Sequence, residues 1–202
     1  MRCVVTKLLG WLCLWLFAVC VVVHVLTFVP SVPISMGSTW PLHVLTLAAC
    51  GVMVVFMNRL QRSRNTAREL DTLGRWRTSQ QKSRETFAEI RAITPRGLYL
   101  AQTALGMYLV INFVVFIALM GSGSPEFSGG KFYLSNHGHV IREITESEFH
   151  RYEAYEVRGF SGHWMFFAMI PAVYFLVVEE RLKEKYRRED GGDEDRSSGA
   201  VV

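Results

Sequence analysis

Apolar residues in this chain gather into four long blocks, and each block is free of Asp, Glu, Lys and Arg. The blocks cover residues 8–29, 41–57, 98–120 and 160–178. A soluble core would show apolar and polar residues interleaved at the period of a helix or a strand, and these blocks do not. A helix of about 20 residues crosses the roughly 30 Å hydrocarbon core of a bilayer. The pattern therefore predicts an all-α integral membrane protein with four transmembrane helices.

The first block predicts an uncleaved helix and not a secretory signal. A signal has an apolar core of about 7 to 15 residues followed by a small-x-small cleavage site. Residues 8–29 form a longer run without a formal charge. The four cysteines, Cys3, Cys13, Cys20 and Cys50, lie in or beside the first two blocks. We expect Cys13 and Cys20 to act as small apolar residues in a membrane helix. None of the four falls where a disulfide would support an exported domain.

The segment 58–97 separates the second block from the third and sets the orientation of the spans. It holds ten Lys or Arg and four acidic residues. Loops this basic stay on the cytoplasmic side of a membrane. The segment 179–202 also begins with a basic cluster. The sequence therefore predicts both termini in the cytoplasm, with residues 30–40 and 121–160 on the exoplasmic side.

Apolar residues at helical spacing within 58–97 predict a cytoplasmic helical hairpin. Gly74 and the polar run 78–83 are expected to separate its two helices. Thr94 and Pro95 are expected to be the cap and the first residue of the third transmembrane helix. Pro41 is expected to be the first helical residue of the second.

Residues 121–160 form the one sizeable segment predicted outside. Residues 131–134 and 140–144 flank an Asn/Gly-rich turn and predict a β-hairpin. Thr145 followed by Glu148 has the spacing of a capping box, which predicts an amphipathic helix directly after Thr145. The segment between the third and fourth transmembrane helices is therefore a small β-hairpin plus a helix.

Three residues disfavour a straight helix at the fourth block, 160–178: Gly159 directly before it, and Gly162 and Pro171 within it. Gly159 and Gly162 are expected to form a hinge at its start, and Pro171 is expected to kink it. The segment 179–202 then passes from its basic cluster into an acidic tail with Gly and Ser, which we expect to be disordered.

Four polar side chains in the blocks are candidates for lining a pore or for hydrogen bonding between helices: His24, His43, Asn112 and His163. Polar groups inside a bilayer are costly and often functional. Asn112 lies more than halfway across its block, so we expect its amide to face another helix. The blocks contain no charged residue, which removes the usual carriers of ion-coupled transport.

Basic residues of the 58–97 segment are candidates for binding an anionic ligand or anionic lipid on the cytoplasmic side. They are Arg62, Arg64, Arg68, Arg75, Arg77, Lys82 and Arg84. A loop that only sets the topology would explain the same residues without a ligand. Because the positive excess is local to this segment, specific nucleic-acid binding is not expected.

The exoplasmic histidines His137, His139 and His150 are the one cluster that resembles a metal site. A defined zinc or copper site needs a third and usually a fourth ligand fixed in space, and the sequence does not supply them clearly. We favour a solvated polar turn and predict no metal and no other cofactor. The chain also lacks G-x-S-x-G, H-E-x-x-H and C-x-x-C, so no enzyme activity is predicted.

Three functional hypotheses follow. The first is a non-enzymatic, oligomeric pore or channel-type subunit with a basic cytoplasmic regulatory surface. The second is an accessory or assembly subunit of a larger membrane complex, without a pore of its own. The third is a membrane enzyme that uses a metal held by the exoplasmic His and Glu residues. In each case the expected partners are membrane lipids and either further copies or other subunits, in the plasma (inner) membrane.

Overall fold

The computed structural model describes the backbone of residues 2–65, 75–121 and 123–198, and the side chains of residues 4–60, 84–121 and 123–188. Its long helices are α1 (Arg2–Leu26), α2 (Met36–Asn65), α4 (Arg96–Met120) and α5 (Glu146–Val173). Each contains a stretch long and apolar enough to cross a membrane, and the described residues hold four such helices. The prediction of a helical chain with four membrane-length helices is confirmed.

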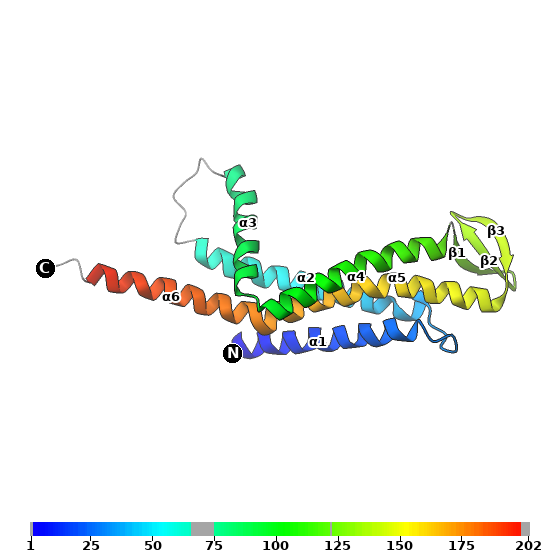
Figure 1. Cartoon of the computed structure of the whole chain (residues 1–202), viewed down its shortest axis with the longest axis horizontal. Coiled ribbons are helices and arrows are strands. Elements are labelled where there is room, and N and C mark those ends of the chain that lie inside the picture. The colour runs from blue at the N-terminus through cyan, green and yellow to red at the C-terminus, as the bar shows by residue number, and fades with distance from the viewer. Residues whose placement is uncertain (1, 66–74, 122, 199–202) are drawn as a thin grey trace.

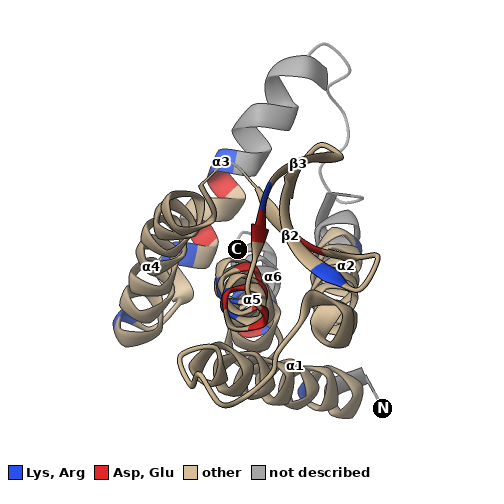
Figure 2. Cartoon of the chain, turned by 90° about the vertical axis from the view of Figure 1, so that its right-hand side faces the viewer, with Lys and Arg blue, Asp and Glu red and all other residues tan. Residues whose placement is uncertain are grey.

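The helix α5 occupies the centre of the bundle. Figure 1 shows successive long helices running in opposite directions, and Figure 2 shows α1, α2 and α4 arranged around α5. In the apolar stretch of α5, 61% of the residues are buried, compared with 22%, 6% and 11% in α1, α2 and α4. The three outer helices therefore expose large apolar side chains on their outer faces, while α5 supplies most of the core.

The chain continues from α5 without a break through a π-helical turn, η2 (Tyr174–Val178), into α6 (Glu179–Ser198). The predicted hinge at Gly159 and Gly162 is wrong, because the helix runs through both residues. The predicted disordered tail is wrong as far as Ser198, because the helical ladder extends that far. The remainder of that prediction, residues 199–202, lies outside the described residues. Pro171 lies within α5, and the irregular turn follows three residues later.

The start of α2 lies earlier than the sequence predicted. Met36 is its first residue, so Pro41 lies inside the helix and not at its start. The hydroxyl groups of Ser38 and Thr39 donate to the carbonyl oxygen of Ser35 at 2.9 and 3.0 Å. These side-chain bonds stabilise a first turn ahead of the proline, which is the sixth residue of α2 and removes the backbone N–H that would donate to the carbonyl of Gly37.

The short helix α3 (Arg75–Ile93) contains the run 78–83, so the predicted break at that run is wrong. The other predicted breaker, Gly74, lies outside the described residues. The Thr94 hydroxyl donates to Ile90 O at 2.6 Å and so ends α3. Pro95, not Thr94, is the N-cap of α4, and it makes no side-chain capping bond. The expected cap is therefore displaced by one residue.

A three-stranded antiparallel sheet links α4 to α5. Its strands are β1 (Ser124–Ser128), β2 (Lys131–Asn136) and β3 (His139–Ile144), in the order β1-β2-β3. The predicted hairpin of β2 and β3 is confirmed. The additional strand β1 contains Pro125, which an edge strand tolerates because one side of its backbone has no ladder partner. We call this sheet and the first turns of α5 the cap.

Candidate functional site

Polar side chains from α1, α2 and α4 converge on one short stretch of α5, near the cap end of the bundle. We call this group the outer polar cluster. Its members are His24, Thr27, His43, Tyr108, Asn112, Arg158, Ser161, His163 and Trp164. All four polar residues singled out from the sequence belong to this group. The sequence did not indicate that they share one region of α5.

A chain of hydrogen bonds through His24 joins three helices. The Ser161 hydroxyl donates to Arg158 O at 3.1 Å, which uses its single proton. His24 Nδ1, at 2.7 Å, therefore donates to Ser161 Oγ. The other ring nitrogen, Nε2, pairs with the Tyr108 hydroxyl, and it accepts from that hydroxyl when the imidazole is neutral. His24 connects α1 to α4 and α5, and it is 6% exposed.

Arg158 anchors the end of α1. Its guanidinium donates to Thr27 O at 2.6 Å and to Thr27 Oγ1 at 3.2 Å. The guanidinium carbon lies 3.9 Å from the centre of the Phe28 ring and 5.4 Å from that of Tyr155. The carbonyl groups at a helix C-terminus carry partial negative charge and favour a cation. Carbonyl acceptors and aromatic faces together stabilise this half-buried charge.

Asn112 is buried against α5, as expected for an amide inside an apolar block. Its Nδ2 donates to Arg158 O at 2.9 Å and to Gly159 O at 3.2 Å. A Cβ on Gly162 would lie 2.6 Å from that same Nδ2, and a Cβ on Gly159 would lie 2.5 Å from the Phe116 ring. The two glycines that suggested a hinge instead allow α4 to approach the backbone of α5 closely.

The other two histidines lie on different helices, His43 on α2 and His163 on α5. Trp164 Nε1 donates to His43 Nδ1 at 3.0 Å, and the Phe160 ring makes an edge contact with His43. His163 lies on the α4 side, with its ring edge-on to Phe113 and its Nδ1 donating to Gly159 O at 3.1 Å. His43 is exposed although it belongs to an apolar stretch. Because its Nδ1 is an acceptor, its proton is on Nε2.

The outer polar cluster holds helices together. The inner side chains of His24, Asn112, Ser161 and Trp164 donate to or accept from neighbouring helices or their own backbone. Interhelical hydrogen bonds of this kind add specificity to helix packing in an apolar environment. The exposed Nε2 of His43 has no assigned acceptor among the described residues.

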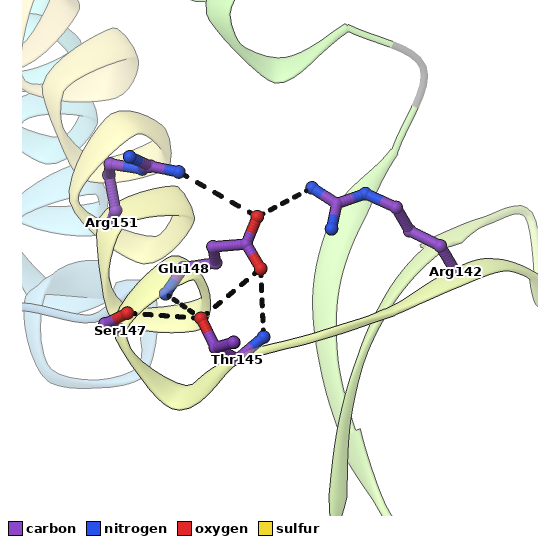
Figure 3. A network of polar contacts seen from close by, with 5 residues as sticks. All are labelled: Arg142, Thr145, Ser147, Glu148 and Arg151. Atoms are coloured by element: carbon purple, nitrogen blue, oxygen red, sulfur yellow. Dashed lines mark hydrogen bonds and ion pairs between the residues drawn. The ribbon is translucent and has the colours of Figure 1, made fainter.

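At the cap end, an ionic and hydrogen-bonded network fixes the sheet to α5 (Figure 3). Thr145 and Glu148 form the predicted capping box: Glu148 N donates to Thr145 Oγ1 at 3.2 Å, and Thr145 N donates to Glu148 Oε2 at 3.0 Å. Arg142 of β3 lies 3.0 Å from Glu148 Oε1, and Arg151 lies 4.0 Å from the same oxygen. The hydrogen bond to Glu148 raises the pKa of the Arg142 guanidinium above its usual value.

The three histidines considered for metal binding lie apart in this cap. His137 is in the β2–β3 turn with a positive φ of 49°, and His139 begins β3. His150 is on α5, where its Nδ1 lies 3.0 Å from Glu153. Among the described residues, no three His, Cys, Asp or Glu side chains gather in the arrangement of a metal site.

At the opposite end, α6 connects to α1 and α3. Lys7 forms an ion pair with Glu180 at 3.0 Å, and Arg181 donates to Ile93 O at 2.8 Å. Lys185 and Tyr186 both donate to the carboxylate of Glu89 on α3. Of the basic residues predicted to bind an anion, Arg84 is exposed on α3. The side chains of the other six, Arg62, Arg64, Arg68, Arg75, Arg77 and Lys82, lie outside the described residues.

Sequence reasoning missed several members of the outer polar cluster, above all Arg158, Ser161 and Tyr108. A count of charges places Arg158 among the cations of the 121–160 segment. Its position two residues before an apolar block was a usable signal, because a cation there is placed to reach the end of a neighbouring helix. A serine and a tyrosine inside apolar blocks give a weaker signal, since both are tolerated there without a partner.

No protein-family model, no curated protein and no solved structure matches this chain.

Proposed function

We propose that this protein is a non-catalytic accessory or assembly subunit of a larger membrane complex. It spans the membrane four times with both termini in the cytoplasm and the cap outside. The observation that carries the proposal is the central position of α5. Within a single chain, α5 fills the axis of the bundle, and its buried polar groups are already hydrogen-bonded to the neighbouring helices.

The dimensions of α5 support the four-span topology. Arg158 at one level and Glu179 at the other are 21 residues apart in the sequence, which is about 32 Å along a helix. This matches the roughly 30 Å hydrocarbon core of a bilayer. The first turns of α5, which pack against the sheet, then project beyond the membrane surface.

The distribution of charge supports the orientation. The end of the bundle that carries the N-terminus also carries α3 and the basic start of α6 (Figure 1). Lys7 and Arg181 are among its described cations, and the sequence of 58–97 adds ten more. Segments with such an excess of Lys and Arg remain in the cytoplasm.

The outer faces of the bundle favour partner subunits. His43 is an exposed residue in the apolar stretch of α2, with its Nδ1 accepting from Trp164 of α5, and its remaining N–H is more stable when a neighbouring helix supplies an acceptor. The prediction of an oligomeric channel stays a prediction. It would require a pore between copies, lined by faces that are mainly apolar in α2 and α4.

The topology is tested with single added cysteines and a membrane-impermeant thiol reagent on intact cells. Ser128→Cys in the cap should be labelled, and Ser79→Cys in α3 should be labelled only after the cells are opened. The unmodified chain, with its four native cysteines, is the control. Labelling of Ser79→Cys from outside would contradict the topology.

The accessory role is tested by native purification and by flux through liposomes. A membrane protein should co-purify at a fixed copy number, and His43→Leu should weaken that association while the cap variant His139→Ala should not. Liposomes that contain the purified chain alone should pass no ions. Conductance by the chain alone, lost on substitution of outer-face residues, would instead establish the channel hypothesis.

A further inference from the structure

The short helix α3 lies crosswise to the bundle. Figure 1 shows α3 at the N-terminal end of α4, running away from the long axis of the bundle. Helices that cross a bilayer follow the bundle axis. A helix crosswise to them at the level where α4 begins is therefore parallel to the plane of the membrane.

Contacts on two sides of α3 define which face is directed toward the bilayer. Glu89 accepts from Lys185 and Tyr186 of α6, the segment that continues beyond the bundle. Arg91, in contrast, has its guanidinium 5.0 Å from the centre of the Tyr99 ring, in the first turn of α4. The Arg91 side of α3 is thus the side toward the apolar part of α4.

Phe87 lies on the same side of α3 as Arg91. Phe87 and Arg91 are two residues before and two residues after Glu89, so at about 100° per residue both point away from it, within about 40° of each other. Arg84 is three residues before Phe87 and extends the same stripe. The phenylalanine is 72% exposed, and both arginines are exposed. A ring this exposed in water is unfavourable, because burying its apolar surface is worth roughly 1.5–3 kcal/mol.

We propose that α3 is an interfacial helix that rests on the inner leaflet, with Phe87 inserted among the lipids and Arg84 and Arg91 on anionic headgroups. The occupant is chosen by charge complementarity: two guanidinium groups flank an apolar ring at the level where the bilayer surface lies. This inference depends on the proposed topology, and it deepens the expectation of anionic lipid by assigning a face and an inserted residue.

The C-terminal end of α3 is held by the bundle, so the orientation of its Arg84, Phe87 and Arg91 face is defined. Ile90 and Ile93 pack against the apolar cluster formed by α1, α5 and α6. Arg181 donates to Ile93 O, and the Thr94 hydroxyl closes the last turn. The helix therefore presents its Arg84, Phe87 and Arg91 stripe in one orientation.

The experiment places a photoreactive p-benzoylphenylalanine at position 87 of the full chain. The matched control places it at position 85, because Glu85 is also exposed but lies about 160° around the helix from Phe87. Each protein is assembled into nanodiscs of phosphatidylglycerol with phosphatidylcholine, or of phosphatidylcholine alone. Illumination should give a lipid adduct at position 87 and little at position 85.

The charge contribution is read from the two lipid compositions. The ratio of lipid adduct at position 87 in the phosphatidylglycerol nanodiscs to that in phosphatidylcholine nanodiscs should fall about fivefold with Arg84→Gln and again with Arg91→Gln. Equal adducts at positions 85 and 87, or crosslinking of position 87 to protein only, would overturn the inference. The labelling of Ser79→Cys distinguishes the two proposals. Labelling from outside would reject the topology, whereas an intact topology with equal adducts would reject only the docking of α3.

Discussion

The thiol of Cys50 lies 3.2 Å from the carbonyl oxygen of Phe167, the oxygen that Pro171 leaves without an intrahelical donor. Proline has no N–H, so the carbonyl four residues before it loses its partner. In α5 that partner is replaced by the Sγ–H of a cysteine on α2. The sequence suggested no hydrogen-bond partner for Cys50, and the structure gives it a role as a donor between two helices.

Substitutions of Cys50 therefore separate the stability contributed by its hydrogen bond from the stability contributed by its packing. Cys50→Ser keeps a donor and should change the free energy of unfolding little, whereas Cys50→Ala should lower it by about 0.5–1 kcal/mol, in the range of interhelical hydrogen bonds. Unfolding in mixed micelles with increasing dodecyl sulfate measures the difference. Equal stability of the Ala and Ser variants would show that the hydrogen bond from the thiol does not contribute to the free energy of unfolding.

Close approach at the glycines of α5 gives a second prediction. Gly159→Ala should destabilise the bundle by about 1–3 kcal/mol, because the new methyl group would overlap the Phe116 ring. Gly51→Ala in α2 is the control: no heavy atom lies within 4 Å of its added Cβ, and alanine favours the helix by about 1 kcal/mol. Thermal unfolding of the purified proteins should move in opposite directions for the two variants.

Arg158 and Phe28 should be energetically coupled. Arg158→Gln removes the charge above the Phe28 ring, and Phe28→Leu removes the ring while keeping an apolar side chain. A double-mutant cycle on the free energy of unfolding should give a coupling of about 0.5–2 kcal/mol, the range of cation–π pairs. Additive effects of the two substitutions would show that the contact with the Phe28 ring contributes nothing to holding Arg158 in place.

The capping box of α5 should control local opening of the cap. Thr145→Ala removes the acceptor for Glu148 N and should cost about 1 kcal/mol. Hydrogen exchange should accelerate at the first amides of α5 and leave the α5 amides beyond Arg158 unchanged. Thr145→Ser, which keeps the hydroxyl acceptor, serves as the control. Faster exchange throughout α5 would mean that the cap and the bundle open together.

The sequence predicted the four long helices well because their apolar blocks exceed the length of most soluble helices and contain no charge. The hairpin and the capping box were also predictable, since both depend on residues that are neighbours in the chain. Predictions that relied on single breakers were poorer. Gly159 and Gly162 do not interrupt α5, because the packing of Asn112 and Phe116 against their backbone outweighs the weak helix propensity of glycine.

Contacts between distant segments were the part that the sequence could not supply. The bonds of His24 to Ser161 and Tyr108 join residues separated by 137 and 84 positions. Local patterns contain no information on such pairs. The direction of α3 is of the same kind: its helical character is local, but its orientation follows from Arg181, Glu89 and Tyr99, which belong to three different helices.

The helical run from Glu146 to Ser198 has a mechanical consequence. At about 1.5 Å per residue it forms a rod of roughly 80 Å. Arg142 holds the sheet to its first turns, and Glu89 holds α3 to its α6 part. A loop between two spans absorbs twist, but a rigid rod transmits it. A torque applied to the sheet by anything that binds it would therefore rotate the α6 side chains that hold α3.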